Sequence, residues 1–238
     1  MAKILFYDIE TFGMDFNADV GFIMAISYKW QGDKKITTLL RTNPRDSAQA
    51  AMNDKELLKQ FIPAYEAADL IVTWNGVSFD NRFVQTRMLK HRLGYLPPAP
   101  QEDGLRTARQ ALKMRRSLEN VGKFFGLKTQ KEKMDFETIW FPAAFGDETA
   151  MKQVVKRCEA DVLLLEEAYN LLAPLSRTHP NVNIIDGKPQ GCPLCGKTKL
   201  QQRGTIPALR HYRIRFQCQN PKCGKWSSSQ PIRVKEKI

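Results

Sequence analysis

Acidic residues that could do chemistry stand at three places in the sequence. Asp8 and Glu10 end an apolar run that predicts a buried strand, and side chains two apart on a strand share a face. Adjacent carboxylates repel each other unless they are protonated or bridged by a cation. Asp80 could equally cap a helix, and Asp161 could be solvated beside an apolar helical stripe. Taken singly, none of these acids identifies a site.

Four cysteines near the end of the chain have the spacing of metal ligands. Cys192 and Cys195 form a C-x2-C pair, and Cys218 and Cys223 form a C-x4-C pair after 22 intervening residues. Two such pairs can surround one Zn²⁺ tetrahedrally. Two disulfides are the alternative, but nothing in the sequence indicates secretion. The spacing therefore predicts one structural zinc ion, and Cys158 stands apart from this group.

The charge of the chain is uneven. Residues 177–238 hold 13 Lys and Arg against 2 Asp and Glu, whereas residues 1–176 hold 24 against 23. A strongly basic segment indicates a polyanionic partner, most plausibly nucleic acid, although a solubilising tail is the alternative. We expect a first domain at 1–176, a linker at 177–190 that is rich in proline and polar residues, and a basic zinc ribbon at 191–238.

Hydrophobic patterning predicts an α/β layer fold with a mixed sheet in the first domain. Strands are expected at 4–9, 20–30, 35–41 and 70–74. Helices are expected at 54–67, 79–91, 105–114, 117–125 and 147–172. Three short strands are expected around the cysteines, at 199–205, 209–217 and 224–234. No run reaches 18 apolar residues, and the first ten residues do not resemble a signal peptide, so we expect no membrane span. We also expect a cytoplasmic protein of bacterial or phage origin.

Three motifs in order resemble the DEDD superfamily of 3′–5′ exonucleases. They are Asp8-Ile-Glu-Thr, then Asn75-x3-Phe79-Asp80, then Asp161 before a run of valine and leucine. The resemblance covers about residues 1–175 and extends to the DnaQ proofreading subunit and the exonuclease domains of family-B DNA polymerases. It implies an RNase H-like mixed five-stranded sheet flanked by helices. It also implies cleavage of single-stranded nucleic acid, DNA favoured, by a two-metal-ion mechanism.

The same resemblance implies a role for each acid. Asp8, Glu10 and Asp161 would hold one Mg²⁺ or Mn²⁺. Asp8 would bridge to a second such ion, which Asp80 would reach directly or through water.

Four further positions match substrate contacts in that family. Thr11 and Phe12 match residues that hold the 3′-terminal nucleotide, with Phe12 stacking on a base. Asn75 and Phe79 match residues that contact single-stranded DNA, although Phe79 could equally belong to the core.

The chain departs from the family at the position of the general base. A Tyr four residues before the last Asp, or a His five before it, normally orients the attacking water, and here these positions hold Arg157 and Lys156. Arginine cannot act as a base at neutral pH, and lysine can do so only with a strongly lowered pKa. We expect Arg157 to lie near the acids as a cation, with Lys156 as the alternative base.

In the ribbon, cations alternate with aromatic residues. Arg213, Arg215 and Trp226 could contact the backbone and bases of nucleic acid, although some aromatic side chains must fill the small core. Two other functions remain open: a nucleic-acid-binding protein with impaired catalysis, and an RNase H-like endonuclease directed by structure. A replication or repair protein is a further possible partner.

Overall fold

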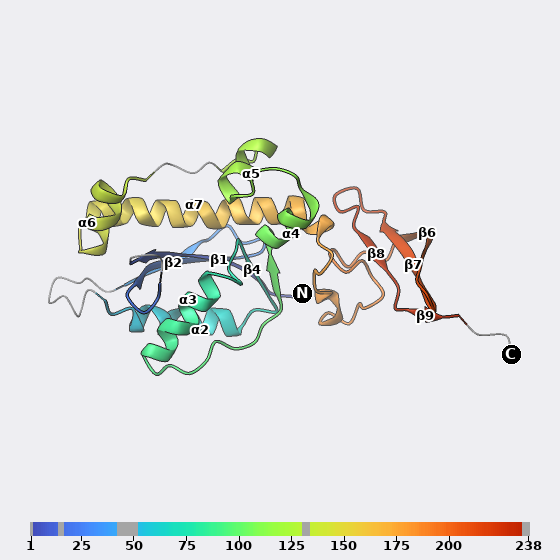
Figure 1. Cartoon of the computed structure of the whole chain (residues 1–238), viewed down its shortest axis with the longest axis horizontal. Helices are drawn as coiled ribbons and strands as arrows, with labels where there is room; N and C mark the ends of the chain where they lie inside the picture. The colour runs from blue at the N-terminus through green and yellow to red at the C-terminus, as the bar shows by residue number, and fades with distance from the viewer. Residues whose placement is uncertain (1, 14–16, 42–51, 130–133, 235–238) are drawn as a thin grey trace.

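The computed structural model describes residues 2–13, 17–41, 52–129 and 134–234. Its larger part is a five-stranded sheet with helices on both faces (Figure 1). The strand order is β3 (Thr37–Leu40), β2 (Phe22–Trp30), β1 (Ile4–Phe12), β4 (Leu70–Thr73) and β5 (Gln101–Asp103). β2 is antiparallel to both β1 and β3, whereas β4 and β5 run parallel to β1. The expected mixed five-stranded sheet is therefore confirmed.

Two layers of helices cover the sheet. The long helix α7 crosses one face together with two shorter helices, and two helices cover the other face (Figure 1). The first layer consists of α4 (Gly104–Ala111), α5 (Leu118–Phe125) and α7 (Glu148–Leu172), and the second of α2 (Lys55–Glu66) and α3 (Asp80–Lys90). With 25 residues, α7 is about 37 Å long.

Alternation along β1 decides which layer each side chain meets. Ile4 and Phe6 pack in the cluster that includes α4, α5 and α7. Leu5, Tyr7 and Ile9 pack against α2 and α3. Because a strand has a side-chain period of two, the positions that continue the first series, 8 and 10, face α7. The central strand thus directs its two acids toward the long helix.

Four short elements flank α7. The π-helix η2 (Phe136–Trp140) and α6 (Phe141–Ala144) precede it, and the 3-10 turns η3 (Ala173–Leu175) and η4 (Val182–Ile184) lead from it toward the C-terminal part. Val182 packs into the same core cluster as α7. The division into a domain, a linker and a ribbon stays a prediction. The predicted linker, residues 177–190, contains the turn η4, whose Val182 is packed in this way.

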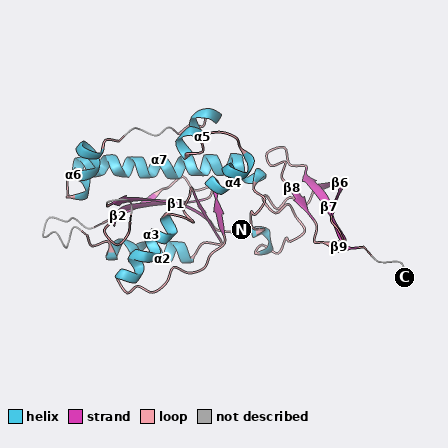
Figure 2. Ribbon diagram, viewed as in Figure 1, coloured by secondary structure: helices cyan, strands magenta, loops and turns pink. Residues whose placement is uncertain are grey.

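The C-terminal part is a small sheet beyond the end of α7, and Figure 2 shows it as strands and loops. It contains β6 (Leu200–Pro207), β7 (His211–Cys218), β8 (Trp226–Ser228) and β9 (Ile232–Arg233). The expected single strand at 224–234 is wrong, since it is two strands that both pair with β7. Pro231 stands between them and lacks the N–H that a continuous ladder would use.

This sheet docks on the larger part through a buried lysine. Lys225 is 5% exposed, and its ammonium donates to the carbonyl oxygens of Ala173, at 3.3 Å, and Ser176. The Ser176 hydroxyl in turn donates to Glu102 at 3.0 Å. No helix among the described residues is long and apolar enough to cross a membrane.

Candidate active site

The two acids of β1 meet helix α7 at the thiol of Cys158. Its sulfur lies 3.6 Å from the Asp8 carbonyl oxygen and 3.9 Å from Asp8 Oδ2. Ligand atoms of Asp8, Glu10 and Cys158 all lie within 4.8 Å of one another. Burial raises the pKa of the Cys158 thiol well above its usual range, and the charges of Asp8 and Glu10 add to this. The thiol is therefore neutral, and the negative charge here belongs to the carboxylates.

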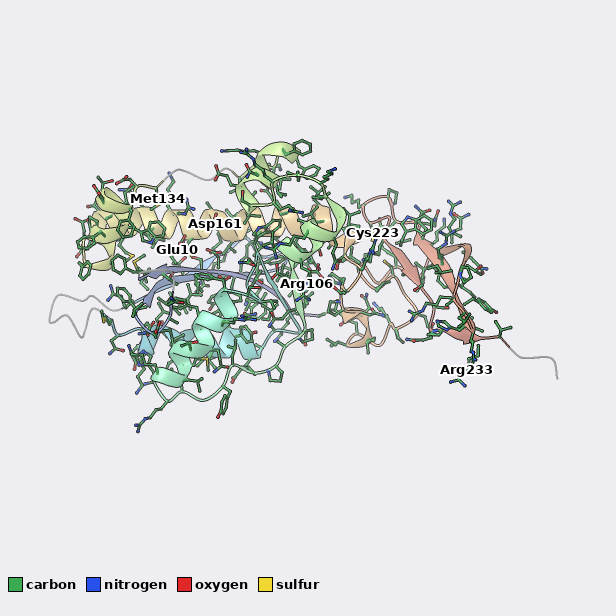
Figure 3. The ribbon with its side chains drawn as sticks, in the orientation of Figure 1. Glu10, Arg106, Met134, Asp161, Cys223 and Arg233 are labelled. Carbon is green, nitrogen blue, oxygen red and sulfur yellow. The ribbon has the colours of Figure 1, made fainter. Side chains whose placement is uncertain are left out.

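Asp161 approaches this place from the same helix, α7, and Asp80 approaches it from α3. Asp161 lies one helical turn beyond Cys158 on α7, and Asp80 is the first residue of α3; both are 4% exposed. Burial raises the pKa of Asp80 to about 7, and the charges of Asp103 and Asp161 act in the same direction. Backbone hydrogen bonds, including one from Ile9 of β1, partly oppose the shift. Asp80 thus interacts with β1 through a backbone hydrogen bond and with Asp161 electrostatically. Figure 3 labels Glu10 on β1 and Asp161 on α7.

The turn that delivers Asp80 is held from several sides. Asn75 has a left-handed backbone with φ of 71°, and its N–H donates to Asp103 Oδ1 at 2.9 Å. The Val77 N–H reaches the other oxygen of Asp103 at 3.4 Å. A Cβ at Gly76 would lie 2.3 Å from the Thr73 hydroxyl, so the close approach requires glycine. The N-cap of α3 is Phe79, which makes no side-chain cap bond, so Asp80 does not serve as the helix cap.

Helix α3 is anchored by a fully buried ion pair. Arg87 donates through Nε and Nη2 to the two oxygens of Asp54, at 2.8 and 2.9 Å, and both side chains are 0% exposed. His91 Nε2 lies 2.6 Å from Asp54 Oδ1, and the Ile23 N–H donates to Asp54 Oδ2 at 2.9 Å. The network fixes α3 to β2 and so fixes the place of Asp80.

Arg157 faces the acids, whereas its neighbour Lys156 is exposed. The Arg157 Nε lies 3.7 Å from Glu10 Oε1, and its guanidinium carbon is 5.9 Å from the centre of the Trp140 ring. Arg157 is four residues before Asp161, so the two share one face of α7. Lys156 does not line either of the two hollows that reach Asp8 and Glu10.

A cavity of about 360 Å³ opens beside Glu10. It is lined by Thr11 and Phe79 from the expected site, together with Phe136, Trp140 and other residues of the 134–140 segment. Trp140 Nε1 donates to the Thr11 carbonyl at 3.0 Å, which holds the indole at the rim. Such a volume is at the lower end of the range for ligand sites.

Phe12 lies elsewhere, inside an aromatic cluster. Its ring contacts those of Phe22, Phe136, Phe141 and Phe145, with centroids 5.5–6.0 Å apart. Asn75 lines a separate hollow that reaches Asp8. The expected substrate residues therefore lie on different sides of the acids, and their contacts with a nucleotide stay predictions.

The four ribbon cysteines have the geometry of a tetrahedral metal site. All four sulfurs lie within 4.8 Å of one another, with Cys192 Sγ 3.7 Å from Cys223 Sγ and Cys195 Sγ 3.6 Å from Cys218 Sγ. A disulfide would bring two sulfurs to about 2.05 Å, whereas Zn–S bonds of about 2.3 Å in a tetrahedron separate sulfurs by about 3.8 Å. The cluster therefore fits a zinc ribbon.

The donor atoms and charge of the acids fit hard divalent cations. Asp8, Glu10, Asp80 and Asp161 offer carboxylate oxygens from three elements, and three of these side chains are less than 9% exposed. Oxygen donors suit Mg²⁺ or Mn²⁺, and a cation would offset the repulsion that helps to raise the pKa of Asp80.

Ribbon residues expected to bind nucleic acid lie on one face of the small sheet. Arg213 and Arg215 are two apart on β7 and exposed, and Trp226 on β8 pairs directly with Gln217 of the same series. The Arg215 guanidinium carbon lies 5.7 Å from the centre of the Trp226 ring.

Sequence reasoning missed several residues of the site. Cys158 was set apart, although its spacing of three from Asp161 places both on one helix face. Phe136 and Trp140 come from a π-helix that no periodicity predicted. Asp103 was not among the expected site residues, although an Asp before a helical run signals the cap that it forms on α4.

Comparisons with known proteins agree with this architecture. Residues 5–173 match the family model of the RNase_H superfamily. Among solved structures, the family B DNA polymerase from the hyperthermophilic archaeon Pyrobaculum calidifontis matches with a TM-score of 0.59 and 15% identity, over 73% of this chain and 25% of the polymerase. This chain thus spans about a quarter of the polymerase, and the likeness concerns the fold alone. A search of curated proteins found no match. Since the family model covers more than half of its residues, the chain belongs to the RNase_H superfamily.

Proposed function

We propose that this chain is a metal-dependent 3′–5′ exonuclease that hydrolyses single-stranded nucleic acid, with DNA as the favoured substrate. The observation that carries the proposal is that ligand atoms of Asp8 and Glu10 on β1 lie within 4.8 Å of the Cys158 thiol on α7. The electrostatic interaction of Asp80 on α3 with Asp161 on α7 supports the inference that these two acids join the same site. Membership of the RNase_H superfamily supports nuclease-like processing of nucleic acid, and the finer assignment is our inference.

The acids would hold two Mg²⁺ or Mn²⁺ ions. Asp8, Glu10 and Asp161 would hold the first ion, and Asp8 and Asp80 the second. When bound, such ions lower the pKa of a water and stabilise the charge that develops on phosphate oxygens. The backbone N–H of Ile9 and the anchored helix α3 keep the Asp80 carboxylate in place for this role.

Arg157 would contribute positive charge rather than act as a base. Its Nε lies 3.7 Å from Glu10 Oε1, so a phosphate bound at the acids is within reach of the guanidinium. A charge-assisted contact of this kind favours a transition state with more negative charge on its oxygens. Lys156 is exposed and serves as the comparison residue for a lysine base.

The cavity beside Glu10 supports cleavage at a strand end. Thr11 and Phe79 line it, and Phe136 and Trp140 add aromatic surface on which a base can stack. A volume of about 360 Å³ suits one terminal residue of a nucleic acid rather than a continuous duplex. Phe12 would act indirectly, by supporting Phe136 at a centroid distance of 6.0 Å.

The ribbon, residues 191–238, would hold one Zn²⁺ and add affinity for the phosphate backbone. Its described residues, 191–234, include no acidic residue, and Arg213, Arg215 and Trp226 share one face. Cations beside an exposed aromatic ring suit a single strand, whose phosphates and bases are both accessible.

A digest of end-labelled, single-stranded oligonucleotides in Mg²⁺ or Mn²⁺ tests the proposal. With a 5′ label we expect a ladder of products that shortens one nucleotide at a time, and with a 3′ label we expect labelled mononucleotide from the start. An internal cut would instead support the endonuclease alternative. No product, with binding retained, would support the catalytically impaired alternative.

A further inference from the structure

Two hollows that share no lining residue with the Glu10 cavity adjoin each other, and together they form a groove along α4. The larger one has a volume of about 500 Å³ and runs from Asp8 past Trp74 and Asn75 to Arg109 and Arg116. A smaller one of about 160 Å³ shares Asn75 and Arg109 and adds Arg106. We call the two hollows together the arginine groove.

The groove joins one end of the acid cluster to a strongly basic wall. Arg106, Arg109 and Arg116 are exposed, and none of them pairs with an acid among the described residues. Asp103, the acid nearest to Arg106 and Arg109 in sequence, accepts hydrogen bonds from the backbone amides of Asn75, Val77, Leu105 and Arg106. Glu119, the acid nearest to Arg116, pairs with Lys123. Three guanidiniums without acidic partners therefore face the groove and are available to an anionic ligand.

The walls of the groove are fixed before any ligand arrives. Trp74 Nε1 donates to the Arg116 carbonyl at 3.2 Å, which ties the segment between α4 and α5 to the end of β4. The Trp74 ring lies so close to Gly104 that a Cβ there would be 2.5 Å from it. A preorganised wall loses little conformational entropy when a ligand binds.

We propose that the arginine groove binds the single-stranded segment on the 5′ side of the terminal nucleotide, with phosphates on Arg106, Arg109 and Arg116 and a base against Trp74. This inference rests on the proposed function, because the strand is placed by its end at the acids. Charge complementarity argues for a polyanion, and the half-buried indole argues for one whose bases are exposed. In the view of Figure 3, Arg106 lies between the labelled acids Glu10 and Asp161 and the ribbon residue Cys223.

Salt dependence of binding provides the test, because each phosphate contact on a single strand contributes about 0.7 to the slope of log K against log[salt]. The full chain is titrated against a fluorescent oligothymidine by anisotropy, with Ca²⁺ in place of Mg²⁺. The double variant Arg109→Gln/Arg116→Gln is expected to lower the slope by about 1.4. Arg109→Lys/Arg116→Lys, which keeps both charges, is expected to restore it. Lys34→Gln/Lys35→Gln, two exposed lysines in the turn after β2, is the charge-matched control and should leave the slope unchanged.

Two outcomes would overturn the inference. The first is an unchanged slope in the glutamine variant, and the second is an equal fall in slope when a DNA duplex replaces the single strand. Because binding is measured without cleavage, a failure of this inference can be told apart from a failure of the proposed function. A lower slope in a protein that cleaves nothing would leave the groove standing, and an unchanged slope in an active nuclease would refute the groove alone.

Discussion

Replacing Asp80 with asparagine is expected to stabilise the protein at pH 8 when no divalent cation is bound at the acids. Asp80 is 4% exposed, and burial together with the charges of Asp103 and Asp161 raises its pKa from an ordinary 3.8 to about 7. Asparagine has nearly the same shape, keeps an oxygen for the Ile9 N–H, and carries no charge. The substitution therefore removes the burial of a carboxylate charge without opening a cavity.

The sign and size follow from proton linkage. Between pH 3.8 and about 7 the folded protein holds a proton on Asp80 that the unfolded chain has released, so the free energy of unfolding falls as pH rises through this window. The total change is about 4 kcal/mol at 1.36 kcal/mol per pKa unit, and about 2.5 kcal/mol of it falls between pH 5 and pH 8. The Asp80→Asn protein lacks this loss. Its advantage over the wild type should therefore grow by about 2.5 kcal/mol from pH 5 to pH 8.

Urea unfolding of zinc-loaded protein, at both pH values and without Mg²⁺ or Mn²⁺, measures this difference. Asp33→Asn, in the exposed turn after β2, is the matched control and should show no such growth. Saturating Mg²⁺ should reverse the order, because a ligand that binds only the folded wild type stabilises it. If Asp80→Asn and the wild type lose stability in parallel from pH 5 to pH 8, the assignment of Asp80 as a buried, charge-strained carboxylate is refuted.

Three further predictions concern the anchor of α3, the cation on α7 and the ribbon. Asp54→Ala leaves Arg87 buried without its partner and should lower the free energy of unfolding by about 3–5 kcal/mol in urea titrations; a loss below 1 kcal/mol would contradict the anchoring role. Arg157→Ala should slow cleavage by about 10- to 100-fold and Asp161→Ala far more, whereas Lys156→Ala should cleave normally; an inactive Lys156→Ala beside an unaffected Arg157→Ala would reverse these roles. Metal analysis should find one zinc per chain, and Arg213→Gln/Arg215→Gln should lower the salt slope of single-strand binding by about 1.4; no zinc, or an unchanged slope, would argue against the ribbon as a nucleic-acid contact.

Local signals made most of the sheet and its acids predictable. The apolar run before Asp8 gave β1, and a period of two correctly placed Asp8 and Glu10 on one face. The long apolar stripe predicted helix α7 to within one residue. The expected start, Asp147, is the residue that caps the helix, and the helix itself begins at Glu148. These features depend on neighbouring residues, so periodicity and capping rules capture them.

Features that depend on tertiary contacts were not predictable in this way. β5 is three residues long, and its partner β4 is distant in sequence. The π-helix that supplies Phe136 and Trp140 has no local signal, and the arginine groove exists only because α4 and the α5 entry meet the end of β4. The docking of Lys225 likewise joins residues about 50 positions apart. Each of these depends on long-range packing, which single-sequence patterns do not encode.

Turnover by the Asp8→Ala protein tests the central claim most directly, because Asp8 is the one acid assigned to both metal ions. Wild-type and variant proteins are compared on a 5′-labelled single strand in Mg²⁺, with folding checked by circular dichroism and Asp33→Ala as an exposed control. We expect the folded Asp8→Ala protein to release no mononucleotide above background, while Asp33→Ala shortens the strand from its 3′ end like the wild type. Near-normal turnover by Asp8→Ala would contradict the assignment of these carboxylates as the catalytic metal site.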